Sequence, residues 1–149
     1  MRAFCARMGA TVPQRKALVL KASRILLSEK PLPERLQAFL EALLEGPFPI
    51  RSGKLYLRKG EGLRLVAQLG GEAGGEEVAL SLEGGGRALG RLSLRLAPAA
   101  SLAPEDRLAL EEAAGILALA LLRERAERAE RVLRRAGECA TQAAGEGGL

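Results

Sequence analysis

The sequence contains no His, no Trp and no Asn, and only 3% of its residues are aromatic. Because His is the commonest general base and the commonest metal ligand, its absence argues against acid–base catalysis and against a transition-metal site. The core must instead be aliphatic, built from Leu, Ala, Val and Ile. We therefore predict a protein without enzymatic activity, cofactor or metal.

Cysteine is also scarce. The two thiols, Cys5 and Cys139, lie in opposite terminal segments, and their spacing matches no zinc or redox motif. We expect both thiols to be reduced and inert. The alternative is a disulfide between the two tails or between subunits.

Long apolar runs are missing as well. No stretch reaches the roughly 18 apolar residues that a membrane span needs. Arg2 and Arg7 precede no apolar segment of the kind that marks a secretory signal. We expect a cytoplasmic protein that makes no contact with a membrane.

Aliphatic and charged residues dominate what is present. The 149 residues are 48% hydrophobic and carry a net charge of +5, which suits one domain with tails. The scarce amides and abundant Arg and Glu indicate a thermophile or a GC-rich genome. The positive charge permits binding to nucleic acid. Basic tails and solvated Arg-rich helices give the same value, so nucleic acid is not an expected partner.

Apolar residues recur at helical spacing in three segments, 14–29, 33–46 and 104–136. The last of these is rich in Leu, Ile and Ala as far as Leu122 and nearly half charged beyond it, so only its first part should pack on a core. These limits divide the chain into a flexible tail at 1–13, a domain at 14–122, a projecting helix or coiled-coil extension at 123–136 and a disordered tail at 137–149.

Between residues 53 and 96 the apolar period changes to 2, which predicts four strands, at 53–59, 63–69, 77–82 and 87–96. Each strand has one Leu-rich face and one polar face, as in an antiparallel sheet that is covered on one side only. Strict alternation places Leu63, Leu65 and Ala88 on the covered face, and Arg87 and Leu89 on the open face.

The predicted fold is therefore α+β, with the order ααββββα and a four-stranded antiparallel sheet that carries its helices on one face. We expect the first helix and the apolar half of the last helix to cover the Leu-rich face, with the second helix as a further candidate.

Several strings of residues match a known pattern. They are the amphipathic entry helix, the hairpin sequence from Gly53 to Gly70, the GRALGRLSL string from Gly86 to Leu94, and the Pro104-Glu-Asp entry into an Ala-rich helix that continues as a charged coil. With these pieces, residues 17–125 resemble a GAF domain. The resemblance implies a GAF/PAS-like fold and a role in signalling.

The chain also departs from that family. GAF domains usually have six strands, and the loops between them roof a ligand pocket, whereas only residues 71–77 fill that interval here. No cysteine lies inside the domain to attach a bilin, and the cysteines of the methionine-sulfoxide-reductase members and the cyclic-nucleotide signature are missing. The resemblance therefore implies the fold and its context, but not the ligand or the chemistry.

The open face of the predicted sheet is basic. Guanidinium groups on neighbouring strands can bind a phosphate or carboxylate in a fork. The same side chains also suit a solvated face, where long Arg stems shield a thin sheet, or a face that docks a partner protein. The candidate residues of this ligand or partner face are Lys54, Tyr56, Arg58, Arg64, Arg91, Ser93 and Arg95.

The charged half of the last helix has apolar residues at alternating spacings of three and four, a heptad pattern that predicts a dimer seam. Charged pairs at i,i+4 (Glu124–Arg128, Glu127–Arg131 and Glu130–Arg134) would by themselves keep an isolated helix solvated, which is the alternative. The predicted seam consists of Leu119, Leu122, Ala126, Ala129 and Leu133.

These observations favour a non-catalytic regulatory and dimerisation module in cytoplasmic signalling. It would contact a second copy through its helices and an unidentified signalling protein through its helices and the basic sheet face. The alternative is a sensor of a small molecule, either a nucleotide or an anionic metabolite. A nucleic-acid binder and an enzyme are the remaining alternatives.

Overall fold

A computed structural model describes residues 10–71 and 74–147 of the chain. The predicted α+β class and the order ααββββα are confirmed. Cys5 and the side chain of Cys139 lie outside the described residues, so the interpretation of the two thiols stays a prediction. The elements are α2 (Val12–Leu26), α3 (Leu32–Glu45), β1 (Ile50–Lys59), β2 (Gly62–Gly70), β3 (Glu77–Gly84), β4 (Arg87–Leu96) and α4 (Pro104–Gly147).

The first helix, α2, begins at Val12 rather than at Gln14, because Thr11 caps it. The Thr11 hydroxyl accepts a hydrogen bond from the Gln14 backbone N–H (3.3 Å), and the Gln14 side-chain oxygen accepts one from the Thr11 N–H (2.8 Å). This reciprocal capping box satisfies backbone donors that a helix start leaves without partners. Pro13 in the first turn has the backbone angle that a helix start needs.

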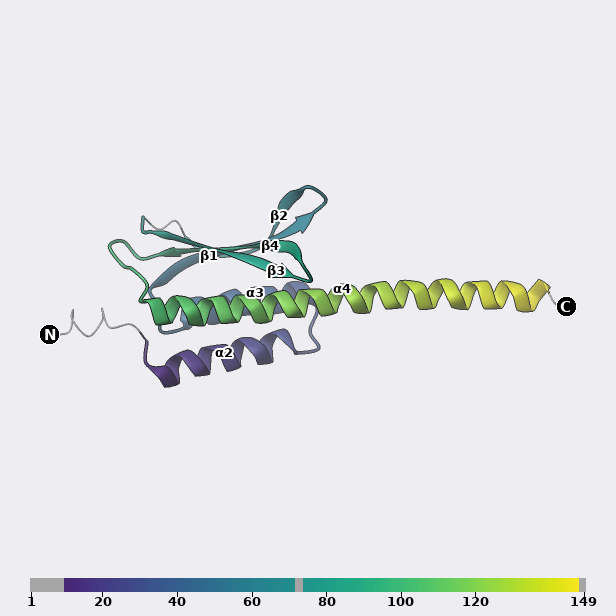
Figure 1. The fold of residues 1–149 in the computed structure, drawn as a ribbon, viewed down its shortest axis with the longest axis horizontal. Helices are drawn as coiled ribbons and strands as arrows, with labels where there is room; N and C mark the ends of the chain where they lie inside the picture. Colours follow the sequence, from purple (N-terminus) through teal and green to yellow (C-terminus); the bar gives the residue numbers. More distant parts are fainter. Residues whose placement is uncertain (1–9, 72–73, 148–149) are drawn as a thin grey trace.

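The molecule has three layers (Figure 1). In the middle layer, α3 packs against β1 and β2, and α4 packs against β3 and β4. The predicted arrangement of helices on one face of the sheet is confirmed. The expectation that the first helix covers the sheet is wrong, because α2 packs against α3 and α4 on their far side. Its buried stripe, Leu18, Ala22 and Leu26, therefore faces other helices.

The four strands form one antiparallel sheet in the spatial order β2-β1-β4-β3. Gly85 and Gly86 join β3 to β4 with φ angles of 61° and 75°, which matches the two-residue turn that best fits the twist of a hairpin. The central strands β1 and β4 pair over most of their length, with Leu55 opposite Leu92. Both of these leucines are fully buried beneath the helices.

A bulge in β2 changes which side chains face outward. Leu55 pairs with Ala67 while Tyr56 pairs with Leu65, so Val66 is an extra residue in β2. One extra residue reverses the face of the side chains on one side of the bulge relative to those on the other side. Leu63 and Leu65, predicted on the covered face, consequently lie on the outer face and are 52% and 42% exposed.

A second bulge has the same effect in β4. Leu82 pairs with Gly90 and Glu83 pairs with Ala88, which leaves Leu89 as the extra residue. Leu89, predicted on the open face, is buried in the core, whereas Ala88, predicted on the covered face, is exposed. Arg87 is likewise displaced from the predicted open face, because it pairs with Gly84, which faces Leu122 of α4.

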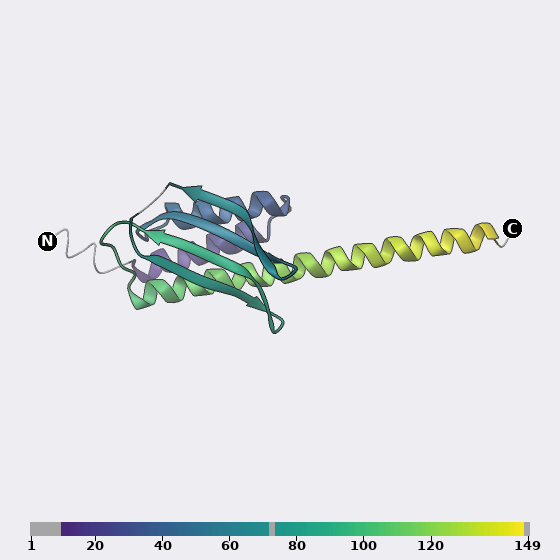
Figure 2. The ribbon, with the colours of Figure 1, turned by 90° about the horizontal axis from the view of Figure 1, so that it is seen from above.

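The last helix, α4, runs without interruption from Pro104 to Gly147 and extends well past the end of the sheet (Figure 2). Its first part contributes Leu110, Ala113 and Leu117 to the core, as the sequence predicts. The helix does not end near Ala136: eleven of the residues predicted to form a disordered tail, 137–147, are helical.

One buried charge joins the start of α4 to the start of α2. Both Asp106 carboxylate oxygens accept a hydrogen bond from the Ala10 backbone N–H at 3.2 Å, and Asp106 forms an ion pair with Arg15 at 3.3 Å. Arg15 also donates to the Ala10 carbonyl oxygen. Because Asp106 is the only buried charged residue of the described chain, this cluster fixes how the two helices meet.

Candidate functional site

The outer face of the sheet, which carries no helix, holds six of the seven residues predicted for a ligand or partner surface. Lys54 lies opposite Ser93 and Tyr56 lies opposite Arg91 in the pairing of β1 with β4, and Arg95 follows on the same face. Cross-strand neighbours of this kind share a face and lie within side-chain reach. The sheet therefore does bring together the polar residues of its two central strands.

These side chains converge on a carboxylate of the edge strand. The Ser93 hydroxyl donates a hydrogen bond to Glu77 Oε1 at 2.6 Å. Arg91 approaches the same oxygen at 3.3 Å, and Arg95 approaches Glu77 Oε2 at 3.5 Å. We call Glu77, Arg91, Ser93 and Arg95 the Glu77 cluster. A carboxylate of the chain itself thus occupies the position between the two guanidinium groups.

The surroundings of Glu77 favour its charged form. The hydrogen bond from Ser93 lowers the pKa of Glu77, and the charges of Arg91, Arg95 and Lys54 lower it further, while partial desolvation acts in the opposite direction. The Glu77 side chain remains 39% exposed, so the cluster is open to water and salt.

Beside this polar cluster the outer face is apolar. The half-buried ring of Tyr56 pairs across with Leu65, and Arg58 pairs across with Leu63. The two exposed leucines belong to this face only because of the Val66 bulge. The outer face therefore combines a charged half near the start of β3 with an apolar half near the tip of the β1–β2 hairpin.

Arg64 and Arg58 lie apart from the other predicted residues. Arg64 pairs with Leu57, so the Val66 bulge places it on the helix-facing side, which corrects its predicted position on the open face. Arg58 lies at the far end of β1, where its Nε–H donates to the Gly60 carbonyl oxygen at 3.3 Å. The predicted basic face is thus divided between two ends of the sheet.

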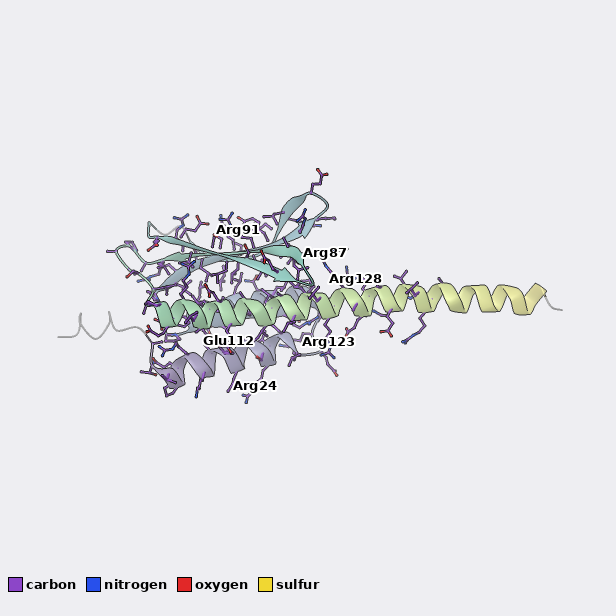
Figure 3. The ribbon with its side chains drawn as sticks, viewed as in Figure 1. Arg24, Arg87, Arg91, Glu112, Arg123 and Arg128 are labelled. Carbon is purple, nitrogen blue, oxygen red and sulfur yellow. The ribbon has the colours of Figure 1, made fainter. Side chains whose placement is uncertain are left out.

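A second surface lies between α2 and α4. These helices form a largely apolar cleft of about 550 Å³, lined in part by Val19, Leu20 and Leu108. Glu112 also lines this cleft, and Figure 3 labels it between α4 and α2. Exposed leucines continue the apolar surface along α4, where Leu119 is 67% and Leu133 is 73% exposed.

The predicted seam residues differ in their surroundings. Leu122 is half-buried and lies against the Gly84 turn, so it already contributes to the domain. Ala126 and Ala129 are exposed, like Leu119 and Leu133. Within the described residues, the seam therefore starts at the edge of the core and continues into the open part of α4.

The ion pairs of α4 differ from those expected. Glu130–Arg134 forms at 4.0 Å, whereas Glu127 pairs with Arg123 at 3.0 Å instead of with Arg131. Glu124 forms an ion pair with Arg35 of α3 at 3.0 Å and approaches Arg131 at 3.9 Å.

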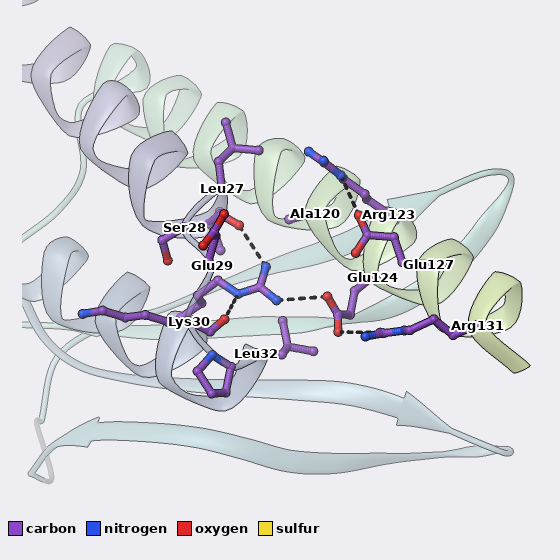
Figure 4. A pocket seen from close by; sticks show the side chains of 13 residues that line it. Leu27, Ser28, Glu29, Lys30, Leu32, Ala120, Arg123, Glu124, Glu127 and Arg131 are labelled. Carbon is purple, nitrogen blue, oxygen red and sulfur yellow. Dashed lines mark hydrogen bonds and ion pairs between the residues drawn. The ribbon is translucent and has the colours of Figure 1, made fainter. Parts of the chain in front are cut away.

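Arg35 joins three elements in a pocket at the point where α4 leaves the domain. Figure 4 shows this pocket, to which α4 contributes Glu124. Arg35 donates hydrogen bonds to the carbonyl oxygens of Lys30 (2.8 Å) and Leu26 (3.0 Å), besides its ion pair with Glu124. The side chains of Arg35 and Glu124 are only 11% and 18% exposed, so this pair is better protected from solvent than the ion pairs between two residues of α4. The contact is a defined junction between the domain and the projecting helix.

Glu77 and Arg35 were not among the predicted site residues. Glu77 starts the third strand, and alternation places it on the polar face, but its neighbours depend on the register with β4, which the sequence does not fix. Arg35 lies on an ordinary helix, and only the fold brings Glu124 to it. Among the described residues no group of three potential metal ligands occurs. The helices described are also too short or too polar to cross a membrane.

Neither a protein-family model nor a curated protein sequence matches the chain, but its fold matches solved structures. The GAF domain of an Acinetobacter phosphoenolpyruvate-protein phosphotransferase has a TM-score of 0.68 at 10% identity over 78% of this chain and 97% of that one. The GAF domain of a putative sensor histidine kinase from Pseudomonas syringae pv. tomato has a TM-score of 0.65 at 19% identity over 78% of this chain and 93% of that one.

Enzymes share this fold too. Free methionine-R-sulfoxide reductase from Neisseria meningitidis, solved in complex with its substrate, has a TM-score of 0.66 at 18% identity over 79% of this chain and 95% of that one. At such identities the likeness concerns the fold alone. The chain has a GAF-like fold, and solved structures with this fold include GAF domains and a methionine sulfoxide reductase.

Proposed function

We propose that this chain is a non-catalytic regulatory and dimerisation module of cytoplasmic signalling, which pairs with a second copy of itself along α4. The observation that carries the proposal is the apolar stripe on α4 that remains open to solvent. Large exposed apolar surfaces are uncommon on soluble monomers and mark interaction sites.

The heptad pattern of this stripe extends to the N-terminal side of the predicted seam. Leu108, Gly115, Leu119, Ala126 and Leu133 fall on one side of α4 at spacings that a coiled coil uses. Leu108 is 63% exposed, and Gly115 is exposed, with nothing near the position of an added Cβ. A knob from a second helix would therefore find open space at Gly115, between two exposed leucines.

The neighbouring helix extends this surface. Leu20 of α2 and Leu27, which caps the end of α2, are more than half exposed, and Leu20 lines the cleft between α2 and α4. Two copies that meet on this side would bury both helices of each subunit in a four-helix arrangement. In a chain that stays monomeric, these exposed leucines would contribute nothing to stability.

The junction at Arg35 suggests how regulation would operate. The contact between Arg35 and Glu124 joins α3 to the first turns of α4 beyond the core. A change at the outer face that alters helix packing would act on this contact and change the direction of the projecting helix. The absence of His, and the engagement of the Glu77 carboxylate by three neighbours, support a role without catalysis.

Sedimentation equilibrium of the whole chain tests the proposal. We expect a dimer at micromolar concentration, and Leu119→Glu should weaken association by about 100-fold, because each interface would bury two facing carboxylates. The matched control is Leu63→Glu, which makes the same change at an exposed leucine outside the stripe.

A wild-type chain that sediments as a monomer over the whole concentration range would contradict the proposal and favour an isolated charged helix. Equal weakening by Leu119→Glu and Leu63→Glu would also contradict it, because the interface would then not lie on the stripe of α4.

A further inference from the structure

At the end of the sheet opposite the Glu77 cluster, the two hairpin tips and α4 line an open cleft of about 490 Å³. Figure 3 shows Arg87 at this end of the sheet, where α4 leaves it. We call this the arginine cleft; its lining residues are Arg58, Gly60, Gly86, Arg87, Ala88 and Arg125.

The Leu89 bulge brings Arg87 to the same side of the sheet as Arg125. Arg87 pairs with Gly84, and a Cβ on Gly84 would lie 2.5 Å from the Leu122 side chain of α4. Because cross-strand partners share a face, Arg87 lies on the side of the sheet that faces α4. Arg125 follows Leu122 by about one helical turn and so comes to the same side.

The charges of the cleft are unbalanced. Three guanidinium groups line it and no carboxylate does. Among the described residues, Arg58, Arg87 and Arg125 form no ion pair within 4.0 Å, whereas Arg91 and Arg95 share Glu77 at the other end of the sheet. Three like charges around one cavity repel one another, and an anion with two negative charges would remove this cost.

The backbone of the cleft is open to a ligand. Gly60 and Gly86 have positive φ angles, and a Cβ added at either position would meet nothing within 4 Å. A ligand can therefore approach the main chain of both turns. Planar guanidinium groups bind tetrahedral oxyanions through paired N–H donors.

We propose that the arginine cleft binds the phosphoryl group of a small phosphorylated molecule. A nucleic-acid backbone fits less well, because Glu124, Glu127 and Glu130 interrupt the arginines of α4 and leave no continuous basic track. Bound there, the anion would tie both hairpin tips to α4 just beyond the core. The proposal adds a ligand to the regulatory role above. Binding of the ligand does not depend on that role, but its regulatory effect rests on it.

The test is a titration of the 15N-labelled whole chain with inorganic pyrophosphate, compared with sodium chloride at matched ionic strength. We expect saturable shifts of the Gly60 and Gly86 amide signals. Arg87→Gln and Arg125→Gln should each weaken pyrophosphate binding by about tenfold, the loss expected for one charge-assisted contact. The control is Arg24→Gln, which removes an equal charge from an exposed position of α2.

Three outcomes of the pyrophosphate titration would overturn the proposal. The shifts could fail to saturate, they could appear at Arg91 and Arg95 instead, or Arg24→Gln could weaken binding as much as the cleft variants. A chain that binds duplex DNA of about 20 base pairs but not pyrophosphate would also overturn it, and would indicate a nucleic-acid surface.

Failure of the cleft is distinguishable from failure of the dimer. The cleft is built from one chain, so Leu119→Glu should bind pyrophosphate with unchanged affinity even as a monomer. Sedimentation of the same samples reports association independently of binding. Loss of pyrophosphate binding in Leu119→Glu would show that the cleft needs the second copy and would overturn its assignment to a single chain.

Discussion

The two sides of the sheet use the same strands for different purposes. On the helix side Leu55, Leu82, Leu92 and Leu94 are fully buried and closely packed. On the outer side Lys54, Arg91 and Glu77 remain in contact with water. The stability of this domain therefore resides on one side of a single sheet, so the other side is free to vary in charge without unfolding the protein.

Two carboxylates also differ in whether their surroundings are buried or open to water. Asp106 is buried between α2 and α4 and binds Arg15 and the Ala10 backbone. Glu77 binds two arginines and a serine at an open edge strand. Both have good partners, but desolvation makes the loss of one partner far more costly at Asp106 than at Glu77.

The largest effect is expected when a leucine is replaced by alanine on the helix side of the sheet rather than on its outer side. Leu82→Ala should lower the free energy of unfolding by about 3 kcal/mol, because it opens a cavity beneath α4. Leu65→Ala, on the outer face, should lower it by less than about 0.5 kcal/mol. Urea unfolding of both variants at one protein concentration measures the difference, since any association changes the apparent stability. Similar losses would show that the outer face is covered in solution.

The next largest effect concerns the buried charge. Asp106→Ala should lower the free energy of unfolding by about 2–3 kcal/mol, because it leaves Arg15 and the Ala10 N–H without their acceptor. The control, Glu105→Ala, removes an exposed charge from the same helical turn and should cost about 0.5 kcal/mol or less through the helix dipole. Equal losses would mean that Asp106 acts only on the helix terminus.

The smallest effect is the pH dependence of Glu77. Its lowered pKa means that the charged form stabilises the fold above the ordinary glutamate pKa, and that this contribution is lost as the pH falls through the folded pKa. The stability difference between wild type and Glu77→Gln should therefore be largest near neutral pH and should vanish in acid.

Added salt should reduce the Glu77 difference as well. Glu83→Gln, on the same strand, removes a negative charge that makes no ion pair among the described residues, and serves as the control. A difference between wild type and Glu77→Gln that stays constant from neutral to acidic pH would contradict the assigned contacts.

Much of the fold follows from periodicity in the sequence. The change of period from 3.6 to 2 predicts the order of elements and the single covered face, because each pattern can bury only one side of its element. The stripe of Leu18, Ala22 and Leu26 predicts a helix but does not identify what covers it. This is why α2, expected on the sheet, lies instead against α3 and α4.

The candidate site was predicted less completely. Alternation correctly groups Arg91, Ser93 and Arg95, but it fails at Val66 and Leu89, because a bulge adds one residue without any change of composition. The positions of Arg64 and Arg87 were wrong for this reason. Glu77 and Arg35 depend on strand register and helix packing, which are set by contacts between distant parts of the chain.

The continuous α4 has a mechanical consequence. Residues 123–147 continue it beyond the core, a length of roughly 37 Å at about 1.5 Å per residue. A rotation of about 5° at the Arg35–Glu124 contact would therefore swing the far end of the helix by roughly 3 Å. A rotation too small to disturb the packing of the sheet would therefore displace the C-terminal end of α4 by about the diameter of an atom.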